Sequence, residues 1–298
     1  MPSIRSIHKF EYLAPASLKE ALDILNTQKD TKVLAGGTDL LVQMKYGLCQ
    51  PSLVIDVKNI PELNEINIGK NGLLHIGSAM PLSTMLAFNS FPKEFKMLLH
   101  ACSLIGSVQI RNRATMGGNI CNAAPSADSA PPLLCLGAQI IAMCVRGSRT
   151  IKLDDFLKGP GKTALDTNEL VTAIDIPLPP EHSAGCYMRH TTREEMDIAV
   201  VGVGSFLTLA QDGKIKQARI ALGAVAPTPI RAHAAEDMLA GKVVTEKIID
   251  QSAVKAAEEA VPISDVRGSA SYRRELVRVL TLRTLKESCR ELGIKAKG

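Results

Sequence analysis

The chain has 298 residues, a length that predicts two or three domains rather than a single hydrophobic core. Its hydrophobic content of 46% is ample for folding, while aromatic residues make up 3% and tryptophan is absent. So few aromatic residues argue against a surface that stacks on nucleic-acid bases. The net charge of +5 comes from scattered lysine and arginine, which fits mild attraction to anionic ligands and not a nucleic-acid-binding stripe.

No apolar run approaches the roughly 20 residues of a membrane span, and the N-terminus lacks the hydrophobic region of a secretory signal. These features predict a cytoplasmic protein. The seven cysteines include no Cys-x-x-Cys pair, which favours neither a disulfide framework nor a zinc or iron–sulfur site. We therefore expect the cysteines to be small buried hydrophobic residues, and no metal ligands are assigned.

Residues 1–58 predict a small unit of alternating strands and helices. A capping box at residues 17–20 begins the first helix, and leucine and alanine follow at helical spacing. The expected elements are a helix over about 18–27, a strand at 32–35, a helix at 40–46 and a strand at 53–57.

Residues 59–178 predict a second subdomain, and the proline cluster at 177–180 marks a domain boundary before the segment 179–298. The expected elements up to that boundary are a strand within 72–80, helices at 82–89 and 93–105, a short helix after Asp128, and strands at 139–145, near 150–153 and at 169–176.

The segment 179–298 predicts a set of antiparallel strands followed by helices, which is an α+β domain. Its strands are expected at 186–191, 199–210 and 215–223, with a hairpin turn at 211–214, and its helices near 231–240, 245–259 and 270–291.

Two Gly-Gly segments share one pattern. In residues 33–42 a short apolar strand leads into Gly36-Gly37, a polar residue and an apolar helix. In residues 113–132 we expect a loop without a packed helix, in which Gly117 and Gly118 form an anion-binding nest. Asp128 or Ser129 then caps a helix whose first turn tolerates two prolines.

Either glycine pair alone is typical of an ordinary turn. Together, with helix caps behind both, they favour a diphosphate that bridges two halves of a dinucleotide. The segment 202–207 lacks the third glycine of a Rossmann fingerprint, and 161–163 lacks the first glycine of a P-loop, where Phe156 stands. No catalytic dyad or triad is visible, so no catalytic residue is assigned.

The residues 33–41 and 114–128 resemble the two FAD-binding signatures in the flavin subunits of molybdenum hydroxylases, the family of xanthine dehydrogenase and the carbon monoxide dehydrogenase medium subunit. The segments 159–163, 193–199 and 265–273 are similar to further family landmarks. The resemblance covers essentially the whole chain.

This resemblance implies a two-subdomain FAD-binding module of the vanillyl-alcohol-oxidase (PCMH) type, followed by a C-terminal α+β domain. It implies an electron-transfer subunit whose flavin accepts electrons from 2Fe-2S clusters on a small partner. A large partner with molybdopterin would hydroxylate the substrate, and NAD or another soluble acceptor would take the electrons. The assembly would be a dimer of heterotrimers without nucleic acid or a membrane span.

The resemblance also implies roles for particular residues. Residues 34–40 would surround the pyrophosphate and the ribityl, and Asp128 would accept from cofactor hydroxyls. Arg189 would lie near the polar edge of the flavin, and the loop 193–197 would gate the ring face. Leu170 and Val171 would pack against the ring. The complete implied set is Lys32, Val33, Leu34, Ala35, Gly36, Gly37, Thr38, Asp39, Leu40, Ile105, Ile110, Thr115, Gly117, Gly118, Asn119, Asn122, Ala127, Asp128, Leu170, Val171 and Arg189.

Two departures from the family pattern stand out. Met196 occupies a position where relatives carry a carboxylate, and the cysteine-bearing insertion of the hydroxybenzoyl-coenzyme-A reductase branch is missing. We therefore expect FAD to be the only redox centre in this chain. Two alternatives remain: a self-contained flavin oxidoreductase of the same fold, and a non-catalytic scaffold subunit that has lost FAD.

Overall fold

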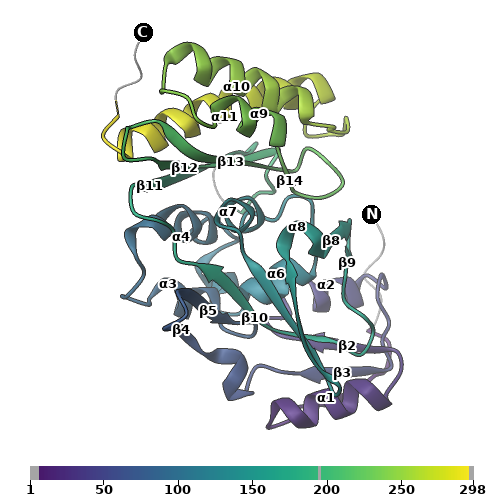
Figure 1. Cartoon of the computed structure of the whole chain (residues 1–298). Coiled ribbons are helices and arrows are strands. Elements are labelled where there is room, and N and C mark those ends of the chain that lie inside the picture. Colours follow the sequence, from purple (N-terminus) through teal and green to yellow (C-terminus); the bar gives the residue numbers. More distant parts are fainter. Residues whose placement is uncertain (1–6, 194–195, 295–298) are drawn as a thin grey trace.

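The computed structural model of the chain describes residues 7–193 and 196–294. Figure 1 shows two halves stacked on one another, with strands β1 to β10 in the lower half and the sheet of β11 to β14 above. The architecture is α+β, as the sequence predicts.

The first sheet is parallel, with the order β1-β3-β2. Its elements are β1 (Glu11–Leu13), β2 (Thr31–Leu34) and β3 (Leu53–Asp56), accompanied by the helices α1 (Leu18–Thr27) and α2 (Leu40–Lys45). Ser17 caps α1 by accepting from the N–H of Glu20, and Ala21, Leu22 and Leu25 are the buried residues of the helix. The predicted helices and strands of this unit are confirmed, whereas β1 was not predicted.

The second sheet is antiparallel, with the order β4-β5-β10-β6-β7. Its strands are β4 (Ile66–Ile68), β5 (Leu73–Gly77), β6 (Gln139–Cys144), β7 (Gly147–Lys152) and β10 (Leu170–Pro177). The helices of this part are α3 (Leu82–Leu86), α4 (Lys96–Ser103), α5 (Val108–Arg111), α6 (Met116–Cys121), α7 (Ala130–Leu136) and α8 (Leu153–Phe156), with the 3-10 turns η1 (Pro61–Asn64) and η2 (Lys93–Phe95) and a hairpin of β8 (Leu157–Gly159) and β9 (Lys162–Thr163).

Helix α6 corrects the prediction of a loop without a packed helix in residues 113–132. Thr115 caps it, because the Thr115 hydroxyl accepts from the N–H of Gly118 at 2.9 Å. Met116 and Ile120 lie four residues apart, so they share one helix face, and both are 1% exposed. Two apolar residues at this spacing were enough to anchor a helix of six residues.

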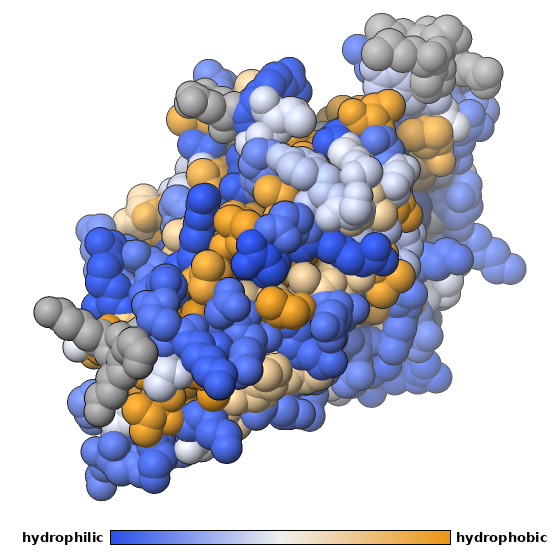
Figure 2. Space-filling view, turned by 90° about the horizontal axis from the view of Figure 1, so that it is seen from above, coloured by the Kyte–Doolittle hydropathy of each residue, from blue (hydrophilic) through white to orange (hydrophobic). Residues whose placement is uncertain are grey.

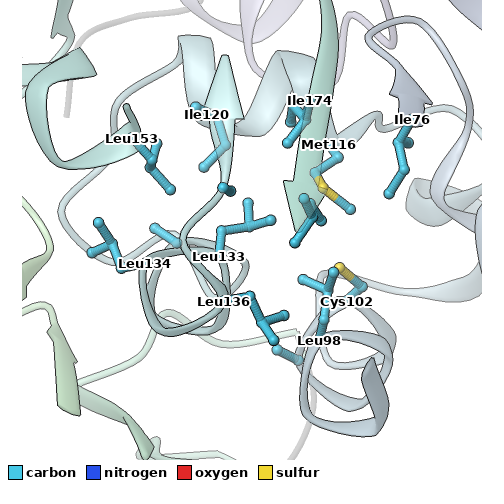
Figure 3. Packing of buried hydrophobic residues seen from close by; sticks show 14 of the residues in the cluster. Ile76, Leu98, Cys102, Met116, Ile120, Leu133, Leu134, Leu136, Leu153 and Ile174 are labelled. Carbon is cyan, nitrogen blue, oxygen red and sulfur yellow. The ribbon is translucent and has the colours of Figure 1, made fainter. Parts of the chain in front are cut away.

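Helix α7 lies at the centre of the main hydrophobic core, and it confirms the predicted helix after Asp128. The predicted side-chain cap is wrong, because Ser129 stands at the N-cap position and makes no capping hydrogen bond. Figure 3 shows Leu133 and Leu136 near Met116, Ile174 and Leu98, which come from three other elements. The two prolines of α7 fall in its first turn, where an N–H group has no acceptor within the helix.

The third sheet is antiparallel, with the order β11-β12-β13-β14. It consists of β11 (Ser183–His190), β12 (Val201–Leu209), β13 (Ile215–Gly223) and β14 (Ile230–Arg231). The helices α9 (His233–Leu239), α10 (Glu246–Glu259) and α11 (Ala270–Glu291) accompany it, while α4 and α7 contact its strands from the lower half. Tyr187, Phe206 and Ala221 of this sheet belong to the main core, so hydrophobic packing continues across the prolines at 177–180.

Seen from above, the upper half has a mixed surface. Figure 2 shows hydrophobic residues on this face in separate groups among hydrophilic ones. In the part of the chain that the structure describes, no helix combines the length and apolar character needed to cross a membrane.

Candidate cofactor site

The first glycine segment forms an open loop at the carboxyl end of β2. Gly37 has a φ of 75°, a left-handed conformation that glycine adopts without the clash of a Cβ. Helix α2 follows directly, and the Asp39 side chain makes no capping bond. Within the described residues, the backbone N–H groups of residues 36–40 have no acceptor. This row of free donors at a helix start is suited to an anion such as a diphosphate.

The second glycine pair has a different conformation. Neither Gly117 nor Gly118 has a positive φ, because both lie in the first turns of α6. The predicted nest at these two glycines is therefore wrong. A Cβ on Gly117 would stand 2.6 Å from the carbonyl oxygen of Ser78, so this glycine packs against backbone. A Cβ on Gly118 would meet only the Thr115 hydroxyl at 3.0 Å and the Ala35 methyl at 4.0 Å, so Gly118 presents an open face.

The structure brings the two segments together. A Cβ on Gly36 would stand 2.2 Å from the carbonyl oxygen of Arg113 and 2.7 Å from the Cα of Ala114, which places the two backbones in direct contact. On the adjacent helices, the Gln43 side-chain amide donates to the Asn122 amide oxygen at 3.1 Å. Gln43 was not among the predicted site residues. Its position one turn into α2 was the available signal, since that turn follows the glycine loop.

An open pocket of about 520 Å³ runs along the first loop. Besides loop residues, it is lined by Tyr12, Asp56, Lys58 and Arg113, none of which was among the predicted site residues. The Asp56 carboxylate accepts from the Tyr12 hydroxyl and the Lys58 ammonium, each at 2.5 Å. Burial opposes ionisation of Asp56, but these donors hold its pKa below the ordinary value. Tyr12 and Asp56 lie in parallel strands beside the loop, and the carboxyl edge of such strands is where open α/β sheets bind ligands.

Asp128, at the end of the second segment, is buried and held by two donors. Its Oδ1 accepts from the Tyr187 hydroxyl at 2.7 Å, and its Oδ2 accepts from the Arg189 guanidinium at 2.6 Å. Burial raises the pKa of Asp128, while the charge of Arg189 and the bond from Tyr187 oppose the rise. Burial and the nearby carboxylate also raise the pKa of the Cys102 thiol to about 12, which keeps the thiol neutral.

The other predicted site residues occupy varied environments. Leu170 and Val171 are each 4% exposed and belong to two different hydrophobic clusters, so their side chains are largely engaged in packing. Ile105 and Ile110 pack against the main core, and Lys32 is exposed on β2. Val33 packs against the cluster of α1 and β3, Ala127 is buried, and the Asn119 amide oxygen accepts from the Ser129 hydroxyl at 2.7 Å.

The predicted gating loop 193–197 is described at both of its ends, while residues 194 and 195 lie outside the described part. The Asp197 carboxylate accepts from the Thr192 hydroxyl at 2.6 Å and from the N–H of Arg193 at 2.9 Å. These hydrogen bonds lower the pKa of Asp197. Met196 is 60% exposed and has a φ of 50°.

The cysteines follow the sequence expectation in part. Cys102, Cys135 and Cys289 are buried, and the other four are half-buried. Burial raises the pKa of Cys121 to about 12 as well, so this thiol within the second segment is also neutral. Among the described residues, no group of three or more histidine, cysteine or acidic side chains is arranged to hold a metal ion.

The residues present fit FAD at these segments. Free backbone donors suit its pyrophosphate, the open face of Gly118 allows close approach, and the Asp128 carboxylate has lone pairs beyond those that the protein uses. The family model of the "FAD binding domain in molybdopterin dehydrogenase" matches residues 8–179, and that of the "CO dehydrogenase flavoprotein C-terminal domain" matches residues 187–288.

The chain belongs to the FAD-binding subunits of molybdopterin dehydrogenases. It is 33% identical to the xanthine dehydrogenase FAD-binding subunit of Escherichia coli O157:H7 over 285 residues, which cover 95% of this chain and 97% of the relative. It is 34% identical to the glyceraldehyde dehydrogenase medium chain of Sulfolobus acidocaldarius over 279 residues, or 94% and 98% of the two chains. Like these relatives, it is an oxidoreductase component.

The fold agrees with a solved member of this family. The carbon monoxide dehydrogenase structure from Hydrogenophaga pseudoflava contains a chain that superimposes with a TM-score of 0.91 at 31% identity, covering 96% of this chain and 99% of that one. The resemblance inferred from the two glycine segments is therefore confirmed, and FAD is the cofactor of the family.

Proposed function

We propose that this chain passes electrons from the iron–sulfur clusters of a small partner subunit to a soluble acceptor such as NAD. A large partner subunit with molybdopterin would oxidise the organic substrate. The observation that carries this proposal is the row of free N–H groups at residues 36–40, in backbone contact with the second segment. The names of the relatives, an FAD-binding subunit and a medium chain, support a role inside an assembly.

When bound, FAD supplies a centre that exchanges one or two electrons. The chain's own residues would bind and orient it. The N–H groups of residues 36–40 would hold the pyrophosphate by charge-assisted hydrogen bonds. The pyrophosphate could also lie close to Gly118, because glycine has no Cβ. Asp128, fixed by two donors, would offer its remaining lone pairs to cofactor hydroxyls. The proposal also retains the predicted positions around the flavin: Leu170 and Val171 would pack against the ring, and Arg189 would lie near its polar edge.

We also propose that the working assembly is a cytoplasmic dimer of heterotrimers, with one large, one FAD-carrying and one small subunit in each half. The relative from Sulfolobus acidocaldarius is named a medium chain, which supports a subunit of intermediate size. The chain covers nearly the full length of both relatives, so it would contribute the whole FAD-carrying part.

The test is a purified complex of the three subunits with flavin absorbance recorded during turnover. We expect a flavin band that is bleached by the organic substrate of the large subunit and restored by NAD or another soluble acceptor. A complex that carries flavin but bleaches without the large subunit would favour a self-contained oxidoreductase. A colourless, active complex would favour a scaffold and contradict the proposal.

A further inference from the structure

The C-terminal half supplies both protein donors that hold Asp128. Tyr187 and Arg189 lie two residues apart on β11, so their side chains leave the same face of the strand. Tyr187 is 2% exposed and the Arg189 side chain is 7% exposed, which means that neither donor is a mobile surface group. The carboxylate at the end of the second segment is therefore oriented from the other side of the domain boundary.

Neighbouring strand β12 has room for this arrangement. Tyr187 pairs with Gly204 and Arg189 pairs with Gly202 in the antiparallel register. A Cβ on Gly202 would stand 2.6 Å from the Tyr187 hydroxyl oxygen, so any larger residue would displace the hydroxyl. Gly202, which belongs to a Gly-Val-Gly sequence that is not a dinucleotide fingerprint, thus makes space for the Tyr187 side chain.

The surroundings leave Tyr187 as a neutral donor. Burial, together with the Asp128 charge, raises the pKa of Tyr187 well above its ordinary value, so the hydroxyl keeps its proton. On the α4 side, Cys102 is neutral, and burial and the nearby Arg189 charge lower the pKa of His100. Arg189 is thus the only charged partner of Asp128 among the described residues.

We propose that Tyr187 is a positioning residue for FAD that acts through Asp128. This inference rests on the proposed function. With Oδ1 held by Tyr187 and Oδ2 by Arg189, the plane of the carboxylate is fixed, and its unused lone pairs point in set directions. Loss of the Tyr187 hydroxyl leaves one oxygen without its donor and frees the carboxylate to turn about the Arg189 bond.

The experiment measures the dissociation constant of FAD from the full-length chain after flavin removal. The test variant is Tyr187→Phe, which keeps the ring in the core and removes only the hydroxyl. The matched control is Thr208→Val, because Ser183 and Thr208 form another buried hydroxyl pair, 2.9 Å apart, between β11 and β12. Asp128→Asn and the double variant Y187F/D128N complete a thermodynamic cycle.

We expect Tyr187→Phe to weaken FAD binding about tenfold, which is typical of losing a hydrogen bond to a charged group. Thr208→Val should leave FAD binding unchanged although it also loses a buried hydrogen bond. Tyr187→Phe should have no further effect when Asp128 is already Asn. Equal weakening by Tyr187→Phe and Thr208→Val, or additive effects in the double variant, would overturn the inference. A wild-type chain that binds no FAD would instead refute the proposed function.

Discussion

The two glycine segments look alike in sequence and differ in structure. In residues 36–40 the backbone turns through a left-handed glycine and leaves its N–H groups free. In residues 117–118 the glycines are helical, and one of them is packed against the backbone of Ser78. The first segment thus needs Gly37 for its left-handed conformation and Gly36 for contact with the second segment. In the second segment Gly117 is needed for packing, and Gly118 leaves an open face.

This difference shows that a Gly-Gly pair indicates close packing at the glycines but does not identify the group that packs against them. At Gly36 it is the carbonyl of Arg113, and at Gly117 it is Ser78. Only at Gly118 does the missing Cβ leave a face available to a ligand. The predictions below separate these three cases by measuring FAD affinity and the stability of the flavin-free chain independently.

The largest effect is expected at the contact between the two segments. In Gly36→Ala the new Cβ would stand 2.2 Å from the carbonyl oxygen of Arg113, so the backbones must separate. Strain of about 1–3 kcal/mol is usual for such overpacking, and it should raise the Kd for FAD about tenfold to a hundredfold. Fluorescence titration with FAD measures this directly. Wild-type affinity in Gly36→Ala would show that the two segments need not touch.

Gly117→Ala should act mainly on folding. Its Cβ would stand 2.6 Å from the Ser78 carbonyl oxygen and 2.7 Å from the Ser78 Cβ, and the Ser78 backbone cannot move away without a cost in free energy. We expect the free energy of unfolding of the flavin-free chain to fall by about 1–3 kcal/mol. Urea unfolding followed by circular dichroism tests this, and an unchanged midpoint would mean that Gly117 is not a packing residue.

Gly118→Ala is the matched counterpart, because the same substitution one residue later enters open space. Only the Thr115 hydroxyl, at 3.0 Å, must give way slightly, and alanine is a better helix former than glycine. The flavin-free chain should therefore unfold within about 1 kcal/mol of wild type. FAD should bind about tenfold more weakly, since a methyl group stands on the open face. Unchanged FAD affinity would place the cofactor elsewhere.

The smallest effect concerns pH. Burial and the Arg189 charge lower the pKa of His100, so the folded chain binds the proton less readily than the unfolded chain. The folded chain therefore loses stability as the pH falls from about 6.5, the ordinary pKa of histidine, through the lower pKa that His100 has in the folded chain. We expect the unfolding midpoint of His100→Gln to fall less than that of wild type between about pH 7.5 and about pH 5.5. Identical slopes would show that the pKa of His100 is the same in the folded and the unfolded chain.

Local sequence patterns predicted much of the fold. Helix α1, α11 and strand β13 have the expected bounds, because capping residues, helical spacing and a hairpin turn are local signals. Strand β1 was missed because its three residues are all exposed and show no alternation.

The contacts that define the site were harder to predict, since they join distant parts of the chain. The Tyr187 hydroxyl reaches Asp128 across 59 residues, and Gln43 reaches Asn122 across 79. The sequence placed Asp128 in the site through the family resemblance, but it gave no sign that β11 would orient the carboxylate. The packing of Gly117 on Ser78 was likewise invisible, because no periodicity links these two residues.

The most direct test of the central claim is amide hydrogen exchange of the chain with and without FAD. N–H groups without an acceptor exchange quickly, so the peptide that contains residues 36–40 should exchange fast in the flavin-free chain. Bound FAD should slow this exchange strongly, while the peptide that contains α10 should be unaffected. Equal exchange of residues 36–40 in both states would contradict the claim that these N–H groups hold the cofactor.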